Sequence, residues 1–557
     1  MVRPGKLIYP QREPVATRAA ATILLLRDAA DGYEVLMTRR SLSASFAPGA
    51  FVFPGGTVDP ADGSAQARDL SRVRRTQGPE QQQFAVAAIR EAFEELGILL
   101  ASPRGEHGLV GQSLVDGMDR SYSADFLAQV AARDLTLAVD QIWWIAHWIT
   151  DRDLPKRFDA RFLVARLPAG QEPRADNSEQ FEPIWISPSE ALRRHSVGEF
   201  DMIFPTIRTL RRMAQWRDID SLLAACSDEG PVWISCPRAG YVKGRIERFS
   251  EDETPFGELE LTSPDGQVAH HLDWQSEQPV RLLSGLWRLT APNPGRMTGP
   301  GTNTYILGND DDGYLVVDPG PPIQAHVDRI AALVKDKLKL ILCTHSHPDH
   351  SPAAPLLQAL APAPILGLPS ASTAEPHSYF RPDRVLEDGE MLALGDDTLE
   401  VIATPGHAAN HLCFFLREDR LLLSGDHVLS GSTTIVSPPD GHMGDYLRSL
   451  DRLAQLEPRF ILPAHGHVIG SALGAIARLK AHRLIREAKV LRAVAALPRR
   501  GLDDLVTLAY DDTPPEAHGI ARRSLLAHLD KLVEDGQLAA EEAGWRVVTS
   551  AVPATTP

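Results

Sequence analysis

Cysteine is scarce in this sequence, with four in 557 residues. The four are scattered, and no two have CxxC spacing: Cys226, Cys236, Cys343 and Cys413. A disulfide framework is therefore excluded as the basis of the fold, and a reducing cytoplasm fits this usage best.

Long apolar runs are also absent. No stretch reaches the ~18 apolar residues of a membrane span. Met1–Ala20 contains no apolar core of about 7–15 residues before a cleavage site. We therefore expect no membrane insertion, no secretory leader and a cytoplasmic location.

An excess of positive charge is missing as well. Lys and Arg number 57 against 73 Asp and Glu, which gives a net charge of −16. A large uniform nucleic-acid-binding surface is therefore not expected, although a local basic patch stays compatible with the sequence. The apolar content of 43% and charged content of 23% are those of a globular protein.

Length and periodicity divide the chain into four regions. At roughly 150 residues per domain, the chain should hold three or four domains. We expect an α/β unit over 15–227, a connector with short strands over 228–279, strand–turn–helix units over 280–470, and helices followed by a hairpin over 471–549. In the first region a helix is predicted over Gln82–Leu96, and the expected strands are Ala21–Leu26, Glu34–Thr38, Gly49–Phe53, Gln141–Ile149 and Asp159–Ala165.

A dense cluster of metal-ligand residue types follows the apolar run Leu338–Leu342. Further ligand types stand in turns after later apolar runs, with His411 as a spare. A single catalytic zinc usually needs only three protein ligands, so the set indicates two ions that share a carboxylate and a bridging hydroxide. For His427, His467 and the spare His411 we expect contacts to the ligands or to substrate. The main candidates are His345, His347, Asp349, His350, His407, Asp426 and His465.

This pattern of HxHxDH, TPGH, GD and AHGH resembles the metallo-β-lactamase superfamily. The resemblance implies a four-layer αββα sandwich and two Zn²⁺ ions. It implies one ion on His345, His347 and His407, and the other on Asp349, His350 and His465. Asp426 would bridge the two ions.

Three features narrow the resemblance to the β-lactamase-like protein 2 subgroup. They are Gly299–Leu307, Asp445–Leu450 and the helical tail. An aspartate at 426 argues against a true β-lactamase, and the 38 residues between Asp426 and His465 leave no room for the large insert of the RNA-processing nucleases. The subgroup carries a small winged-helix-like C-terminal domain, and its animal member is a single-strand RNA endonuclease. The basic residues of Arg478–Arg500 could form a phosphate-contacting face or an ordinary solvated helix face.

A second candidate site lies on the predicted helix Gln82–Leu96. Glu91, Glu94 and Glu95 stand at i, i+3 and i+4 and so share one face. Hard oxygen ligands of this kind suit Mg²⁺ or Mn²⁺ held together with substrate phosphates. With Arg90 and Gly97 they resemble the box of the Nudix hydrolases, which implies an α/β/α sandwich.

Two departures from the Nudix box stand out. The first box glutamate is Gln82, and an insertion within Thr57–Glu80 separates Gly56 from the box; Glu80 is a possible substitute. The segments Leu36–Ser41 and Phe53–Gly56, with Gly49, resemble the signature of Nudix enzymes that split coenzyme A, although Ser45 stands where an arginine is expected.

The sequence therefore predicts a bifunctional metal-dependent hydrolase, with Asp349, Glu91 and Glu94 as the catalytic residues. One site would cleave a nucleoside diphosphate derivative such as coenzyme A or its esters, and the other an ester, thioester or phosphodiester. The expected partner is a small-molecule substrate, with RNA open at the C-terminal half; the oligomeric state is left open. The alternative is a Nudix domain that senses a nucleotide and regulates an RNA endonuclease.

Overall fold

The computed structural model describes residues 2–43, 47–122, 124–175, 180–227, 230–374 and 376–548. Ser45 lies outside the described residues. The chain forms two compact units, one over 13–237 and one made of 1–12 together with 238–557. The boundary after Pro237 falls inside the predicted connector, so most of 228–279 belongs to the second unit.

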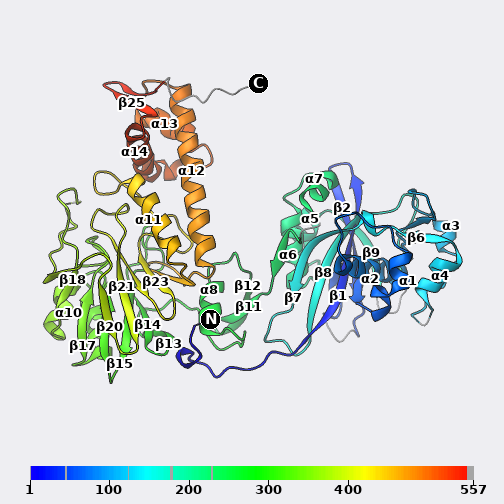
Figure 1. Ribbon diagram of the computed structural model, residues 1–557, viewed down its shortest axis with the longest axis horizontal. Coiled ribbons are helices and arrows are strands. Elements are labelled where there is room, and N and C mark those ends of the chain that lie inside the picture. The colour runs from blue at the N-terminus through cyan, green and yellow to red at the C-terminus, as the bar shows by residue number, and fades with distance from the viewer. Residues whose placement is uncertain are drawn as a thin grey trace. The chain divides into compact units, whose positions relative to one another are not determined.

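The first unit, called the α/β/α unit below, is built on one mixed sheet (Figure 1). The strand order is β10-β7-β8-β1-β2-β3, with β4 on β1 and β9 on β2. The strands are β1 (Thr17–Ala29), β2 (Gly32–Arg40), β3 (Phe51–Val52), β4 (Gly55–Thr57), β7 (Trp143–Ile149), β8 (Arg157–Arg166), β9 (Gln180–Ile186) and β10 (Trp233–Ser235), with a separate pair β5 (Ala101–Pro103) and β6 (Leu135–Leu137).

Residues of β1 alternate between two helical layers, as a strand buried on both faces requires. Ile23 and Leu25 pack with α2, whereas Leu24 and Leu26 pack with α6 and α7. The predicted three-layer α/β/α sandwich is confirmed. The helices are α1 (Ala65–Asp69), α2 (Pro79–Leu96), α3 (Gln112–Val115), α4 (Phe126–Ala132), α5 (Pro188–Ser196), α6 (Phe204–Met213) and α7 (Ile219–Ala225).

The second unit, called the αββα unit below, is built on two large sheets, ordered β13 to β19 and β20 to β24, and also holds the two-stranded pairs β11-β12 and β25-β26. The strands of the first sheet are β13 (Val280–Leu283), β14 (Leu286–Thr290), β15 (Asn303–Asn309), β16 (Gly313–Val317), β17 (Leu338–Leu342), β18 (Ile365–Gly367) and β19 (Arg384–Val385). Those of the second are β20 (Met391–Leu394), β21 (Asp397–Ala403), β22 (Leu412–Leu416), β23 (Leu421–Gly425) and β24 (Phe460–Pro463).

The two sheets pack face to face, and helices cover their outer faces. Tyr305 and Leu307 of β15 meet Phe414 of β22 in the core between the sheets. Ile306 faces the layer of α9 and α10, and Phe415 faces α11 and the start of α12. The predicted αββα sandwich is confirmed. These helices are α9 (Gln324–Val334), α10 (Ala354–Leu360), α11 (Met443–Gln455) and α12 (Ala472–Ala496).

The tail continues from α12 into a small domain with its own core, in which Val490, Leu505 and Leu529 are buried. Its elements are α13 (Leu502–Ala509), α14 (His518–Glu534) and the hairpin β25 (Leu538–Glu541) and β26 (Gly544–Val547). This is the predicted arrangement of helices followed by a hairpin.

Two further segments join the αββα unit. Strands β11 (Arg238–Val242) and β12 (Arg245–Phe249) precede helix α8 (Phe256–Thr262), which lies where only short strands were expected and buries Leu261 between the sheets. Residues 2–12, called the N-terminal arm below, pack on the same unit. Arg3 pairs with Asp419 at 2.7 Å, and Lys6 pairs with Asp397 at 2.6 Å.

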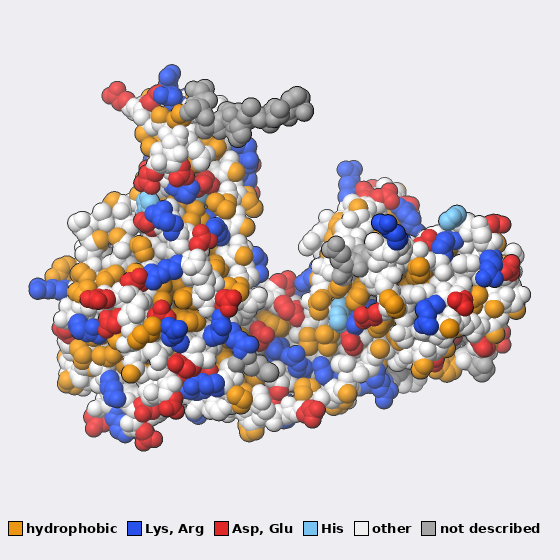
Figure 2. Space-filling model, viewed as in Figure 1, with side chains coloured by type: hydrophobic (Ala, Val, Ile, Leu, Met, Phe, Trp, Pro, Cys, Tyr) orange, Lys and Arg blue, Asp and Glu red, His pale blue; other side chains and the backbone are white. Residues whose placement is uncertain are grey.

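None of the helices in the described part of the chain is long and apolar enough to cross a membrane. On the face shown in Figure 2, acidic and basic side chains are interspersed over both units. The net negative charge is therefore not gathered into one large patch on that face.

Candidate active sites

Four strand ends bring the seven predicted ligands of the αββα unit together. β17 leads into the turn 344–350, and β21, β23 and β24 end just before His407, Asp426 and His465. Because β17 belongs to one sheet and the other three to the second, the site lies at the edge of both sheets. Such strand ends are where α/β enzymes commonly place their sites.

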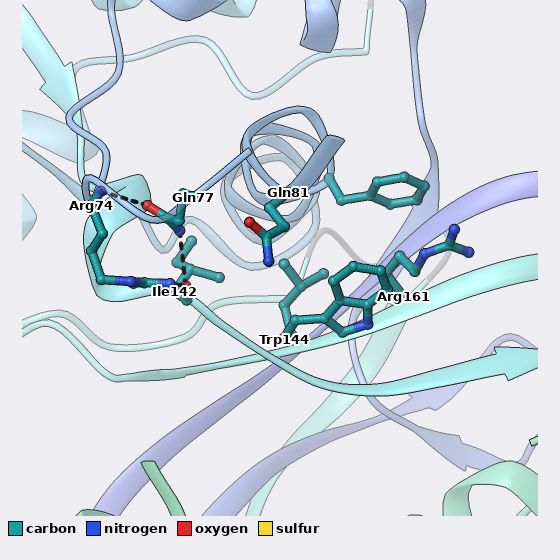
Figure 3. Close-up of a pocket in the computed structure, with 8 residues that line it drawn as sticks. Arg74, Gln77, Gln81, Ile142, Trp144 and Arg161 are labelled. Atoms are coloured by element: carbon teal, nitrogen blue, oxygen red, sulfur yellow. Dashed lines mark hydrogen bonds between the residues drawn. The ribbon is translucent and has the colours of Figure 1, made fainter. Parts of the chain in front are cut away.

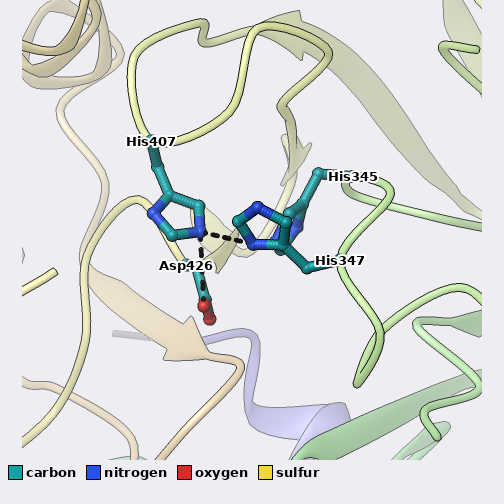
Figure 4. Close-up of side chains that lie close together, drawn as sticks. All are labelled: His345, His347, His407 and Asp426. Atoms are coloured by element: carbon teal, nitrogen blue, oxygen red, sulfur yellow. Dashed lines mark hydrogen bonds and ion pairs between the residues drawn. The ribbon is translucent and has the colours of Figure 1, made fainter. Parts of the chain in front are cut away.

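One group of ligand atoms belongs to His345, His347, His407 and Asp426, and these atoms lie within 4.8 Å of one another. His347 Nδ1 is 2.9 Å from His345 Nε2 and 3.0 Å from His407 Nε2. Asp426 Oδ2 lies 3.6 Å from His407 Nε2. The four side chains point toward a common centre (Figure 4).

A second group belongs to Asp349, His350 and His465. Asp349 Oδ2 is 3.4 Å from His350 Nε2 and 3.3 Å from His465 Nε2. Asp426 Oδ1 faces the same two nitrogens at 3.5 and 3.2 Å. One oxygen of Asp426 thus faces each group, as a bridging carboxylate would.

These groups fit metal ions better than they fit a cluster held by hydrogen bonds alone. His350 Nε2 and Asp426 Oδ1 are buried and have no hydrogen-bond partner among the described residues. Burying a polar atom without a partner costs about 1–3 kcal/mol, and imidazole nitrogen and carboxylate oxygen are preferred zinc ligands. Seven such groups facing inward suit two divalent ions.

The outer nitrogens of two of the ligand imidazoles are held by backbone oxygens. His407 Nδ1 lies 2.7 Å from Ile435 O, and His465 Nδ1 lies 3.2 Å from Gly301 O. A proton on the outer nitrogen leaves the inner nitrogen free to bind an ion.

Asp318, which the sequence interpretation missed, holds the turn that carries the ligands. It accepts hydrogen bonds from Thr344 N at 2.7 Å and from Thr344 Oγ1 at 2.8 Å, and its Oδ2 is 2.9 Å from His350 Nδ1. The only sequence signal for it is an aspartate directly after the apolar strand β16.

The three other histidines near the site lie beside the ligands. His411 Nε2 accepts a hydrogen bond from Asp426 N at 3.2 Å. His427 is fully buried, and His467 Nδ1 lies 3.1 Å from the carboxylate of Glu258. Of the three, His411 thus binds a ligand residue directly, whereas the roles of His427 and His467 stay a prediction.

Burial and neighbouring charges set the protonation of the site. Burial, with His347 beside it, lowers the pKa of His407 to about 4. Although burial opposes it, His465 and His350 hold the pKa of Asp426 well below its usual range. Against burial, Asp426 and Asp349 raise the pKa of His465 to about 10, so ion binding there displaces a proton.

Two of the basic residues on the tail helix α12 are buried and bind other parts of the protein. Arg483 and Arg486 are buried, with 3% and 8% of their surface exposed. Arg483 donates to Thr434 O, next to the carbonyl that holds His407, and Arg486 pairs with Asp512 at 2.8 Å. Neither a phosphate-contacting face nor a solvated face describes these two arginines.

In the α/β/α unit, the predicted glutamate face lies on the last turns of α2. Arg90 Nη1 is 2.9 Å from both Glu91 Oε1 and Glu94 Oε2, whereas Glu95 Oε2 accepts a hydrogen bond from Gly55 N at 3.0 Å. Burial, opposed by Arg90, raises the pKa of Glu91 to about 7. Among the described residues, the groups gathered closely enough to hold an ion are the two in the αββα unit, so these glutamates share a face without converging on one point.

The insertion in the box supplies a carboxylate that the sequence interpretation missed. Asp62 is 2% exposed and lies 3.0 and 3.1 Å from two nitrogens of Arg90. Gln82 instead contacts Arg68 O at 3.4 Å, and Glu80 pairs with Arg161 at 2.8 Å. Glu80 therefore does not replace the missing box glutamate, and Asp62 is the inserted carboxylate that contacts the box arginine.

The glycine that the insertion displaces in sequence stays close to the box in space. A Cβ added at Gly56 would lie 2.5 Å from the carboxylate oxygens of Glu91. The insertion therefore leaves the contact between β4 and the glutamate face intact.

A small pocket lies beside the N-terminal end of α2, with Trp144 and Arg161 on the neighbouring strands (Figure 3). The Arg161 guanidinium lies 5.1 Å from the Trp144 ring centre. The interior measures about 10 Å³, about the space of one water molecule. It is too small for a nucleotide in this structure.

Three family models match the chain. The metallo-beta-lactamase superfamily matches residues 297–465, the beta-lactamase associated winged helix domain matches 502–545, and the NUDIX domain matches 16–203.

Several curated proteins are similar in sequence. The atrochrysone carboxyl ACP thioesterase dmxR1 of Cryptosporiopsis sp. is 32% identical over 210 residues, which are 37% of this chain and 62% of that protein. The lactamase-like protein nscB of Trichophyton rubrum is 31% identical over 53% of this chain and 90% of its own length. The beta-lactamase-like protein 2 homolog of Caenorhabditis elegans is 29% identical over 46% and 88%. The chain spans less than two thirds of the thioesterase.

Solved structures are similar to parts of the chain. A metallo-beta-lactamase family protein from Thermus thermophilus has 25% identity and a TM-score of 0.40, and the match covers 48% of this chain and 100% of that one. A NUDIX hydrolase from Alicyclobacillus acidocaldarius has 29% identity and a TM-score of 0.34, with 39% and 99% covered.

Proposed function

Because the chain belongs to the metallo-beta-lactamase superfamily, carries a NUDIX domain and is a metal-dependent hydrolase, we propose that it hydrolyses two kinds of bond at two sites. The αββα unit would use two zinc ions to hydrolyse an ester, thioester or phosphodiester. The α/β/α unit would use Mg²⁺ or Mn²⁺ to cleave a nucleoside diphosphate derivative such as coenzyme A or its esters. The observation that carries the first assignment is Asp426, whose two oxygens face two groups of ligand atoms.

At the αββα site, His345, His347 and His407 would hold one ion and His350, His465 and Asp349 the other. When bound, two zinc ions would polarise the scissile group and activate a water near neutral pH. We assign the orientation and deprotonation of that water to Asp349. Its side chain is 24% exposed, more than its partners His350 and His465, and it accepts a hydrogen bond from Thr302 Oγ1 at 3.1 Å.

A thioester is the bond class that we propose first for this site. The relative named as an ACP thioesterase is 32% identical over 210 residues. The presence of a NUDIX domain on the same chain points to an acyl-coenzyme A, from which one site would release the acid and the other would cleave the diphosphate. Incubation with acyl-coenzyme A followed by mass spectrometry should then show free acid and 4′-phosphopantetheine; finding neither would refute this joined version.

At the α/β/α site, we propose that Glu91, Glu94 and Glu95 hold the ion and that Glu91 and Glu94 act in catalysis. Burial raises the pKa of Glu91 to about 7 in the absence of an ion, so binding of a divalent ion by this carboxylate would release a proton near neutral pH. Mg²⁺ prefers carboxylate oxygens together with substrate phosphates. Binding of both would draw Glu91 and Glu94 away from Arg90.

A nucleotide sensor is the second candidate for the α/β/α unit. It is favoured by Gln82 and by the contact of both Glu91 and Glu94 with one arginine nitrogen. In that case nucleotide binding without turnover would change RNA cleavage by the αββα unit. The buried Arg483 and Arg486 remove two cations from the face that RNA would contact, which makes this candidate the weaker one.

A substrate panel on three proteins tests the proposal. Coenzyme A esters, nucleotide sugars, dinucleoside phosphates, thioesters and short RNA are incubated with wild type, Glu94→Gln and Asp349→Ala. We expect Glu94→Gln to abolish diphosphate cleavage alone, which would rule out the sensor, and Asp349→Ala to abolish the second activity alone. Metal analysis that finds essentially no zinc, with His345→Ala leaving all hydrolysis intact, would refute the assignment of the αββα site.

A further inference from the structure

A buried carboxylate on α8 lies beside the turn that carries the ligand His465. Glu258 is fully buried and pairs with Arg288, whose Nη2 is 3.1 Å from Glu258 Oε1. His270 Nε2 lies 3.0 Å from the same oxygen. An ionised group buried this deeply is tolerated only when it is fully paired, so this cluster holds one geometry.

The same carboxylate holds the ligand turn. His467 Nδ1 is 3.1 Å from Glu258 Oε2, and Val468 N donates to that oxygen at 3.4 Å. These two residues directly follow the His465-Gly466 pair. The contacts therefore fix the exit of the turn whose first residue is a proposed metal ligand.

Helix α8 approaches this segment closely enough to make Glu258 rigid. A Cβ added at Gly257 would lie 2.1 Å from Gly470 N and 2.5 Å from Val468 O, distances that only glycine permits. The helix thus packs backbone to backbone on the segment 468–470 that follows the turn of His465, and Glu258 has little freedom to move away.

The opposite side of the turn is held by other groups. Asn303 Nδ2 donates to Pro463 O and to Gly466 O, at 3.0 and 2.9 Å, and His465 Nδ1 contacts Gly301 O. Residues 301–303 come from β15 and the loop before it, within the matched metallo-beta-lactamase range, whereas Glu258 lies outside that range. The turn is therefore clamped from two directions, one of them by the segment that follows the α/β/α unit.

We infer that Glu258 is a positioning residue for His465 and so for the ion that Asp349, His350 and His465 would hold. This inference rests on the proposed two-ion site. Loss of groups that orient a ligand typically lowers metal affinity 10- to 100-fold. The effect should be confined to one ion. Among the described residues, the carboxylate of Glu258 binds Arg288, His270, His467 and Val468, and the last two belong to the turn of His465 and not to the turns of the other ligands.

Zinc titration of single and double variants, in competition with a chromophoric chelator, tests this. His345→Ala leaves the ion at His465, and Asp349→Ala leaves the ion at His345. We expect Glu258→Gln to weaken zinc binding about 10- to 100-fold in the His345→Ala background and by less than about twofold in the Asp349→Ala background. Glu247→Gln, which removes an exposed carboxylate from β12, is the matched control and should change neither.

Further variants separate positioning from general stability. Glu258→Gln leaves Arg288 buried without its partner, so the pair is also removed together as Glu258→Gln with Arg288→Met, which can be nearly neutral for folding. His467→Gln breaks the link to the turn while the Glu258–Arg288 pair stays. Both should weaken the same ion. Equal weakening in both backgrounds, or none in either, would overturn the inference; a wild type that binds fewer than two zinc ions would instead overturn the proposed site.

Discussion

Replacing Asp318 by asparagine should prevent the proposed ligand His350 from binding an ion, although His350 itself is unchanged. Asp318 Oδ1 accepts from Thr344 N, and Oδ2 accepts from Thr344 Oγ1 and faces His350 Nδ1. The asparagine oxygen must stay on the Thr344 amide, which cannot turn, so its NH₂ group would point at His350 Nδ1. Two donors would then face each other, and the His350 proton would move to Nε2.

The consequence is a lost lone pair at the inner nitrogen of His350. Nε2 is buried and has no hydrogen-bond partner among the described residues, and it is the atom that faces Asp349 and Asp426. We expect zinc affinity at this ion to fall about 100-fold, the upper end of the usual effect of an orienting group, equivalent to about 2.8 kcal/mol.

The assay is a competitive zinc titration of wild type, Asp318→Asn and Asp311→Asn. Asp311 is exposed on the loop before the same strand, so its substitution is a charge-matched control. In a His350→Ala background, Asp318→Asn should have no further effect on metal binding, because the group it orients is gone. An Asp318→Asn protein that binds both ions as tightly as wild type would refute the tautomer argument.

Three further predictions concern other parts of the molecule. Asp62→Asn should lower diphosphatase kcat/KM about 10- to 100-fold, the equivalent of one charged hydrogen bond, because Arg90 loses the charged partner that the insertion supplies. Asp59→Asn is the control, and an unchanged kcat/KM in Asp62→Asn would contradict this prediction. Burial lowers the pKa of His326 to about 4 in the folded protein. Below the ordinary pKa of about 6.5 the unfolded chain therefore binds a proton that the folded protein does not, and lowering the pH from 7 to 5 should reduce the free energy of unfolding by about 2 kcal/mol through this residue. Urea titrations at the two pH values should show this additional loss of unfolding free energy in the wild type and not in His326→Gln. Equal losses in the two proteins would contradict the prediction. Arg483→Met should lower the unfolding free energy by about 1.5–3 kcal/mol, since the carbonyl of Thr434 loses its buried donor, whereas Arg478→Met, at an exposed position, should not.

Local signals made the fold and the ligand sets readable from the sequence. An apolar run followed by a small-residue turn marks a strand end, and the two layer architectures follow from alternation along strands such as β1 and β15. The two family resemblances are confirmed by the matched models. His345 and Glu91 were found because their partners lie within a few residues of them.

Residues whose partners are distant in sequence were missed. Asp318 acts through strand pairing between β16 and β17, and Asp62 reaches Arg90 across an insertion. Glu258 is one charged residue on a short helix, and nothing near it in sequence indicates full burial. The two interpretations of the basic run on α12, a phosphate-contacting face or a solvated face, were wrong for Arg483 for a related reason. Helical spacing shows which residues share a face, but it does not show that Arg483 faces the protein interior.

The N-terminal arm changes how the two halves of the chain can be separated. Because Arg3 and Lys6 pair with Asp419 and Asp397, the αββα unit is made from both sides of the NUDIX domain, which is an insertion within that unit. The chain passes from one unit to the other after residue 12 and again after residue 237. A protease that cuts at one of these places leaves the two units linked through the other place, so two cuts are needed to release them. A fragment that starts at Arg238 would leave the carboxylates of Asp397 and Asp419 buried without these cations. During synthesis, Arg3 and Lys6 cannot meet their partners until the whole NUDIX domain and the chain as far as these two carboxylates have been made.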